Sequence, residues 1–154
     1  MIDSPEAIKI LIDAGLDIDT TDLDGYKTLM KTQSLKLAQL LIEAGVDVNC
    51  TTTDQNSYLI AVLKENKTKL EIVEIIINAG ADVNFQEPMF GTTALMHVRN
   101  LNMAKILIQA GADPSIRDFN GHLAYQQYHF YLYEELENLR KYLNACYENH
   151  LLNQ

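Results

Sequence analysis

Histidines and cysteines are the residues of this chain best suited to metal binding or proton transfer. The sequence holds His97, His122, His129, His150, Cys50 and Cys146. Cys146 and His150 are four residues apart on one expected helix face, but no second pair of ligands accompanies them. His97 falls on an expected short helix, where a structural role is favoured, and His122 at the exposed entry to another. We therefore predict no metal site and no cofactor.

Acidic residues are the other candidates for chemistry, and Asp22 and Asp24 form the most suggestive pair. Paired carboxylates act as acid and base when burial or a neighbouring charge separates their pKa values. These two fall on an expected exposed loop, where nothing would desolvate them. The sequence also has no glycine-rich phosphate loop and no nucleophile elbow. It therefore predicts a protein that is not an enzyme.

The charge of the chain is strongly negative, with 21 acidic against 12 basic residues and a formal net charge of −9. Acidic residues are densest before Lys27, where Lys9 is the sole basic residue. Such a surface repels phosphate backbones and attracts basic proteins. We expect a basic protein as partner and no nucleic acid, although acidity can also serve solubility alone.

Length and hydropathy favour a small cytoplasmic protein. The 154 residues suffice for one domain with its own core. No apolar run approaches the roughly 20 residues that a membrane helix needs. The N-terminus has no basic stretch followed by an apolar block, so no secretory signal is expected. Two distant cysteines give no disulfide framework, which favours a reducing compartment.

Four ten-residue segments align without gaps and end in Ala-Gly: residues 6–15, 36–45, 71–80 and 102–111. Their apolar residues recur at helical spacing, so each predicts a helix that its glycine ends in the left-handed conformation. The closing glycines Gly15, Gly45, Gly80 and Gly111 are 30, 35 and 31 residues apart. The expected N-caps are Ser4, Ser34, Thr68 and Asn100, with Pro5 as the first helical residue and Glu71 completing a capping box with Thr68.

A second pattern follows each glycine: Asp-hydrophobic-Asn or a similar triplet, a polar loop and a short inner helix. The inner helices are expected near Leu29, Leu59, Leu95 and Tyr125, which lie 14, 14, 15 and 14 residues after the glycines. Turn glycines stand at Gly25, Gly91 and Gly121, with Gln55 in that place in the second loop. The third loop has one extra residue within 85–90. Units 27–45 and 93–111 are about three residues short, roughly one helical turn, so their inner helices should be short.

This pattern resembles the ankyrin-repeat family, whose unit is a β-turn and two antiparallel helices over about 33 residues. The resemblance covers essentially the whole chain and implies an all-α solenoid of helix-turn-helix units joined by β-turn loops. We expect one domain, 1–154, with an N-terminal half repeat 1–20, repeats at about 21–50, 51–85 and 86–116, and a helical capping unit 117–154. The family's Thr-Pro-Leu-His signature is nowhere intact. Its histidine links neighbouring loops, so that network is in question here, but not the stacking.

The C-terminal unit carries an apolar helix face formed by Leu136, Leu139, Leu143 and Cys146, as a cap needs. Six of the eight tyrosines lie in this end: Tyr125, Tyr128, Tyr131, Tyr133, Tyr142 and Tyr147. They either close the open end of the core or form a second contact surface.

The resemblance implies that a partner protein binds to the loop tips and inner helices, the concave side of such a stack. Carried over residue by residue, the candidate surface is Asp22, Leu23, Asp24, Tyr26, Thr53, Asp54, Asn56, Lys64, Met89, Phe90, Thr92, Arg99, Phe119, Asn120 and His122. Loop tips are usually polar, so the large apolar residues among them favour a binding patch. The alternative is that Met89 and Phe90 fold back over the extra residue of their own loop.

The favoured function is an inhibitory protein that occludes a basic partner such as a toxin. The chain is similar to bacterial immunity proteins of this family in size and in its short repeats ending Ala-Gly-Ala-Asp-Val-Asn. In this hypothesis Asp22, Asp24 and Asp54 pair with basic side chains, while Phe90 and Phe119 act as apolar anchors. The alternative is an adaptor or effector that docks onto host or regulatory proteins, or a piece of a larger ankyrin scaffold. The free chain is expected to be a monomer.

Overall fold

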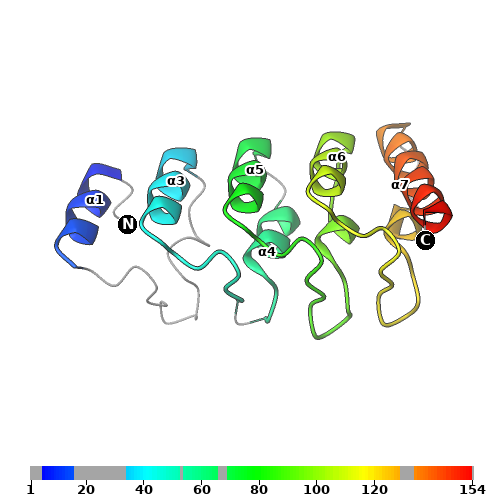
Figure 1. Ribbon diagram of the computed structural model, residues 1–154, viewed down its shortest axis with the longest axis horizontal. Coiled ribbons are helices and arrows are strands. Elements are labelled where there is room, and N and C mark those ends of the chain that lie inside the picture. The colour runs from blue at the N-terminus through cyan, green and yellow to red at the C-terminus, as the bar shows by residue number, and fades with distance from the viewer. Residues whose placement is uncertain (1–4, 16–33, 53, 66–68, 129–133, 154) are drawn as a thin grey trace.

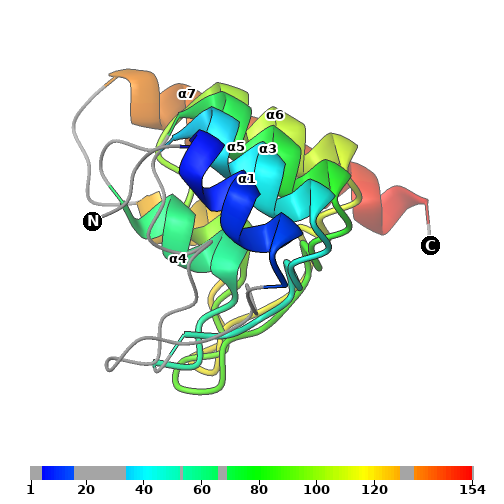
Figure 2. The ribbon, with the colours of Figure 1, turned by 90° about the vertical axis from the view of Figure 1, so that its left-hand side faces the viewer.

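The structure, a computed structural model, describes residues 5–15, 34–52, 54–65, 69–128 and 134–153. Five outer helices stand side by side in a row (Figure 1): α1 (Pro5–Asp13), α3 (Leu35–Glu43), α5 (Leu70–Asn78), α6 (Leu101–Gln109) and α7 (Glu134–Leu152). Behind them lie α4 (Tyr58–Lys64) and two 3-10 helices, η1 (Ala94–Met96) and η2 (Ala124–Tyr128). Figure 2 shows the loops projecting together on one side of the stack. The predicted all-α solenoid is confirmed.

The outer helices repeat one local design. Helices α1, α3, α5 and α6 each have nine residues and end two residues before a glycine. Gly15, Gly45, Gly80 and Gly111 have φ values of +85°, +90°, +92° and +91°. Beyond each of the last three glycines the chain donates back into its helix, as Val46 N does to the Leu41 carbonyl at 3.1 Å. The predicted termination by glycine is confirmed.

The N-terminal caps follow the register of the repeat. Ser34 Oγ accepts from Leu37 N at 3.4 Å, and Asn100 Oδ1 accepts from Met103 N at 2.9 Å, as expected. Pro5 is the first residue of α1, as predicted.

The cap predicted at Thr68 is wrong, because the N-cap of α5 is Lys69, which forms no side-chain capping hydrogen bond. Lys69 stands 11 residues before Gly80, the same separation as Ser34 from Gly45. Helix α5 therefore starts in the register of the other outer helices and not at the local capping-box pattern. Thr68 and the expected cap Ser4 lie outside the described residues.

The core runs along the stack between outer and inner elements. Two columns are fully buried in helices α3, α5 and α6, at 0% exposure: Ala38, Val73 and Ala104, and Leu41, Ile76 and Leu107. Leu59 and Leu95 of the inner elements pack against them. Fully burying one large aliphatic side chain is worth about 1.5–3 kcal/mol, so the leucine and isoleucine column contributes substantially to the stability of the stack. Leu11, the residue of the second column in α1, is in contrast 37% exposed, because α1 has a described helix on one side only.

The inner elements differ in length as predicted. In the second loop's repeat the inner helix α4 has seven residues, whereas η1 in the next repeat has three. The short unit 93–111 therefore lacks one turn, as its spacing indicates. The other inner helix expected to be short, near Leu29, lies outside the described residues.

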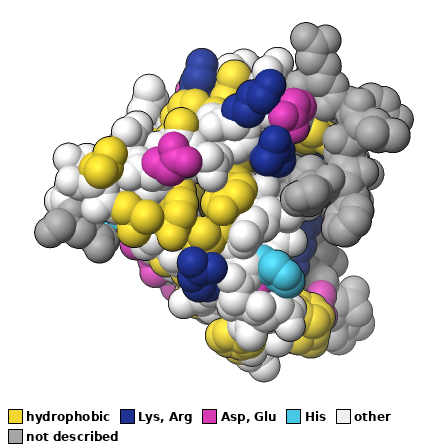
Figure 3. Space-filling view, turned by 90° about the vertical axis from the view of Figure 1, so that its right-hand side faces the viewer, with side chains coloured by type: hydrophobic (Ala, Val, Ile, Leu, Met, Phe, Trp, Pro, Cys, Tyr) yellow, Lys and Arg dark blue, Asp and Glu magenta, His cyan; other side chains and the backbone are white. Residues whose placement is uncertain are grey.

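The C-terminal helix α7 has 19 residues and closes the core with its apolar face. Leu139 and Leu143 are fully buried, Tyr142 packs against the core, and the rings of Tyr125 and Tyr147 are 6.0 Å apart. These tyrosines fit the prediction of an aromatic closure; Tyr131, Tyr133 and His129 lie outside the described residues. Hydrophobic side chains also gather in the middle of this end of the molecule (Figure 3). A second contact surface here remains a prediction.

Candidate functional site

The three described loops are built on one backbone pattern. They run from Thr52 to Asn56, from Glu87 to Thr92 and from Asp118 to His122, and in each the first N–H donates to the last carbonyl, at 2.9, 3.1 and 3.0 Å. In each, the turn residue donates to the carbonyl of the first residue, at 2.8, 2.8 and 2.9 Å. The middle loop accommodates its predicted extra residue inside this turn. The three described loops therefore share one backbone framework and differ in the side chains at their tips.

The turn residues adopt the left-handed conformation, which the residue type favours at the two glycines but not at Gln55. Gly91 and Gly121 have φ values of +71° and +84°, and Gln55 takes the same place with a φ of 59°. Among the described residues Gln55 is the one non-glycine residue with a positive φ. Such a backbone is strained for a residue with a side chain.

Asparagine side chains link each repeat to the next. Asn49 Nδ2 donates to the Gly80 carbonyl at 3.1 Å, and its Oδ1 accepts from Asp82 N at 2.8 Å. Asn84 makes the same two bonds to the next repeat, at 3.1 and 2.8 Å. Losing the family histidine therefore does not remove hydrogen bonding between units. The sequence showed the Asp-hydrophobic-Asn pattern but not this role.

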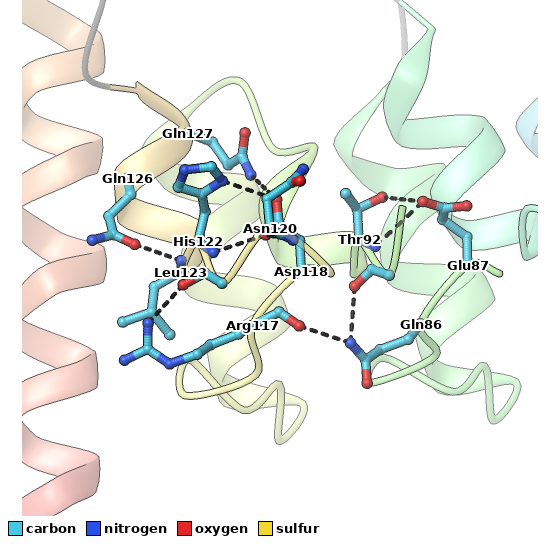
Figure 4. A network of polar contacts seen from close by, with 12 residues as sticks. Gln86, Glu87, Thr92, Arg117, Asp118, Asn120, His122, Leu123, Gln126 and Gln127 are labelled. Carbon is cyan, nitrogen blue, oxygen red and sulfur yellow. Dashed lines mark hydrogen bonds and ion pairs between the residues drawn. The ribbon is translucent and has the colours of Figure 1, made fainter. Parts of the chain in front are cut away.

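The third loop is organised by a buried carboxylate that the sequence analysis did not single out. Glu87 is 2% exposed and accepts from Met89 N and Phe90 N, each at 2.7 Å. It also accepts from Thr92 N at 3.3 Å and from the Thr92 hydroxyl at 3.1 Å. Burial raises the pKa of Glu87, but these hydrogen bonds outweigh it and the pKa is lowered. An ionised Glu87 thus fixes the loop tip (Figure 4).

His97 supports the same loop from the inner turn. Its Nε2 lies 2.8 Å from the Thr92 hydroxyl oxygen. Because the carboxylate of Glu87 can only accept, the Thr92 hydroxyl donates to Glu87 and His97 Nε2–H donates to Thr92. Burial lowers the pKa of His97 to about 4, and the charges of Lys64 and Arg99 act in the same direction. A neutral, structural His97 agrees with the role expected from the sequence.

Asp118 repeats this arrangement in the fourth loop. It is 8% exposed, and its Oδ1 accepts from Asn120 N at 2.9 Å and His122 N at 2.8 Å. Its Oδ2 accepts from Gln127 Nε2 at 3.1 Å. One column of the repeat could have revealed this role, since Asp22, Thr52, Glu87 and Asp118 each stand seven residues after a helix-ending glycine.

Loops three and four present an exposed apolar strip, which we define as Met89, Phe90 and Phe119. These side chains are 67%, 56% and 65% exposed. The alternative in which Met89 and Phe90 fold back over their own loop is therefore wrong. Phe119 N donates to the Phe90 carbonyl at 2.8 Å. A β-carbon at Gly91 would lie 2.5 Å from Cδ1 of Phe119, so this ring lies directly over the glycine.

The other predicted site residues lie beside this strip or outside the described chain. Asp54, Lys64, Arg99, Asn120 and His122 are exposed, while Asn56 and Thr92 are half-buried. Lys64 Nζ donates to Asn56 Oδ1 at 2.7 Å, and Arg99 Nη2 donates to the Lys64 carbonyl at 3.4 Å. Asp22, Leu23, Asp24, Tyr26 and Thr53 lie outside the described residues.

The polar side chains of these loops serve the loops themselves. Within the described part of the chain, no group of three His, Cys, Asp or Glu residues could hold a metal ion. None of its helices is long and apolar enough to cross a membrane. The loops expose the apolar strip to solvent, and hydrogen bonds within the loops hold the backbone that carries it. Such a surface suits protein recognition.

Residues 31–118 match a family model described as ankyrin repeats, three copies. The chain belongs to the ankyrin-repeat family. It is also 31% identical over 71 residues to a putative ankyrin repeat protein of Acanthamoeba polyphaga mimivirus. This match covers 45% of the chain and 44% of the viral protein, so the chain aligns with less than half of that relative. Ankyrin repeats are protein interaction modules, and this chain is one of them.

Proposed function

We propose that this ankyrin-repeat chain is a non-catalytic module that binds one partner protein through its row of loop tips. The observation that carries the proposal is the exposure of Met89, Phe90 and Phe119 on loops fixed by internal hydrogen bonds. Aromatic side chains dominate the energy of many interfaces. Because the loops are already ordered, binding loses little conformational entropy.

We further propose that binding is inhibitory and that the chain occludes a basic partner such as a toxin, as an immunity protein does. The net charge of −9 supports this, because it accelerates encounter with a positively charged protein. The acidic contribution on the loop side is assigned to Asp22, Asp24 and Asp54. In this proposal the protein is cytoplasmic and monomeric when free.

The alternative function is an adaptor that docks onto several host or regulatory proteins. The similarity to an ankyrin repeat protein of a giant virus supports keeping this alternative. The two functions differ in the number of partners and in the dependence of association on salt.

An affinity pull-down from the source cell, read by mass spectrometry at low and moderate salt, separates them. The inhibitor proposal predicts one stoichiometric basic partner that is captured faster at low salt. Several unrelated partners without a salt effect would favour the adaptor. Capture of no protein at either salt concentration would contradict both.

A further inference from the structure

The charges beside the apolar strip are not those that the overall composition suggests. The described loops contain three acidic residues, and two of them, Glu87 and Asp118, are buried in hydrogen bonds to their own loops. Asp54, in the second loop, is the exposed one. A partner at loops three and four therefore meets little of the negative charge of the chain.

Two cations lie on the inner side of these loops instead. Lys64 ends α4, and Arg99 follows η1 in the next repeat; both are exposed, and Arg99 Nη2 donates to the Lys64 carbonyl at 3.4 Å. The Lys64 ammonium donates to the amide oxygen of Asn56, and among the described residues no carboxylate forms an ion pair with it. An amide oxygen leaves the positive charge of Lys64 uncompensated.

A chain of contacts joins these cations to the strip. Arg99 follows His97 by two residues, and His97 donates to Thr92, which ends the loop that carries Phe90. A third exposed cation, Arg117, directly precedes the fourth loop, and its Nη1 donates to the Gly121 carbonyl at 2.7 Å. Lys64 and Arg99 thus lie near the base of the third loop, and Arg117 is bonded to the turn of the fourth.

We propose that loops three and four bind a segment of the partner in which an apolar side chain stands next to a carboxylate. The apolar side chain would pack on Phe90 and Phe119, and the carboxylate would lie between Lys64 and Arg99. This inference rests on the proposed function and deepens it. Together with the exposed Asp54 of the second loop, these cations place charges of opposite sign at different points along the described loops. Such a division fixes the direction in which a partner lies.

The test is selection of a random peptide library, displayed on phage, against the intact chain. The proposal predicts winning peptides with Asp or Glu beside Leu, Ile, Phe, Tyr or Trp. A synthetic peptide with a selected sequence should bind about tenfold more weakly to the Lys64→Glu/Arg99→Glu variant than to the wild type, since each exposed ion pair contributes modestly. The neutral pair Lys64→Gln/Arg99→Gln should lie between this variant and the wild type.

The matched control is Lys9→Glu/Lys105→Glu, which makes the same change of net charge on the outer helices α1 and α6, where both lysines are exposed. It should leave binding of the selected peptide nearly unchanged. Glu65 is exposed next to Lys64, so Glu65→Gln should strengthen binding. Unchanged thermal midpoints show that each variant is folded.

Winning peptides rich in Lys or Arg, or no enrichment at all, would overturn the inference. So would equal loss of binding in the outer-helix control. Peptides selected for apolar residues without charge preference, and lost in Phe90→Ala/Phe119→Ala, would overturn the charge assignment alone. In that case the proposed function would stand.

Discussion

The second and third loops are built on the same backbone hydrogen bonds but differ in their first residue and in their turn residue. Thr52 and Glu87 occupy the same column, as do the turn residues Gln55 and Gly91. The hydroxyl of Thr52 accepts one bond, from Asn56 N at 3.2 Å, whereas the carboxylate of Glu87 accepts four. The third loop, in which the first side chain accepts more hydrogen bonds, is also the loop that exposes the large apolar side chains Met89 and Phe90.

This difference has a physical reason. An exposed apolar tip gains nothing from solvent and would collapse onto the loop unless its backbone were held in place. Glu87 binds the amide groups of Met89 and Phe90 themselves, so the residues that contact a partner are the residues that the carboxylate fixes. In the second loop a polar tip needs no such support.

The largest expected difference between the two loops is in the free energy of unfolding that is lost when Glu87 or Thr52 is removed. Glu87→Ala leaves three loop amides without their acceptor and should lower the free energy of unfolding by about 3 kcal/mol. Thr52→Ala removes one hydrogen bond and should cost about 1 kcal/mol. Urea unfolding of both variants measures the two costs. Equal costs would mean that Glu87 does not organise its loop more strongly than Thr52.

A β-carbon at the turn glycines should have unequal effects in the third and fourth loops. Gly91→Ala meets the ring of Phe119, whereas Gly121→Ala meets nothing within 4 Å although its φ is also positive. Backbone strain of about 1 kcal/mol is common to both. The clash should add about 1 kcal/mol more for Gly91→Ala and displace the ring of Phe119. Thermal unfolding and the NMR shifts of Phe119 test this, and identical behaviour would contradict the packing.

The smallest effect is expected at the strained turn of the second loop. Gln55→Gly relieves a side chain at a φ of 59°, and should raise the free energy of unfolding by about 0.5 kcal/mol after the entropy of glycine is counted. Gln55→Ala serves as the control, because it keeps the strain. A loss of stability in Gln55→Gly would show that the glutamine side chain stabilises its turn.

Local spacing was sufficient to predict the stack itself. The apolar columns and the closing glycines determine where each outer helix packs and ends, and the structure follows them. The start of α5 follows the same spacing, because its N-cap Lys69 stands 11 residues before Gly80, as Ser34 does before Gly45. The local capping pattern at Thr68 pointed one residue earlier, so the register of the repeat is the better predictor here.

The exposed strip was also predictable, because Met89, Phe90 and Phe119 are large apolar residues at turn positions. The role of Glu87 was visible only as a column of polar residues seven positions after each closing glycine, and the role of Asn84 depends on a distance between repeats that the sequence does not give. A carboxylate at a loop tip is expected in solvent, and Glu87 is buried only because several amides converge on it. Asn84 reaches the next repeat only at the separation that stacking produces.

The most direct test of the central claim is capture of partner protein by Phe90→Ala/Phe119→Ala together with its thermal midpoint. The matched control is Leu151→Ala/Leu152→Ala, which removes two exposed apolar side chains at the far end of α7. The account predicts at least about tenfold weaker capture by the loop variant, a midpoint close to that of the wild type, and no change in the control. A midpoint lowered by many degrees, or capture that equals the control, would contradict it.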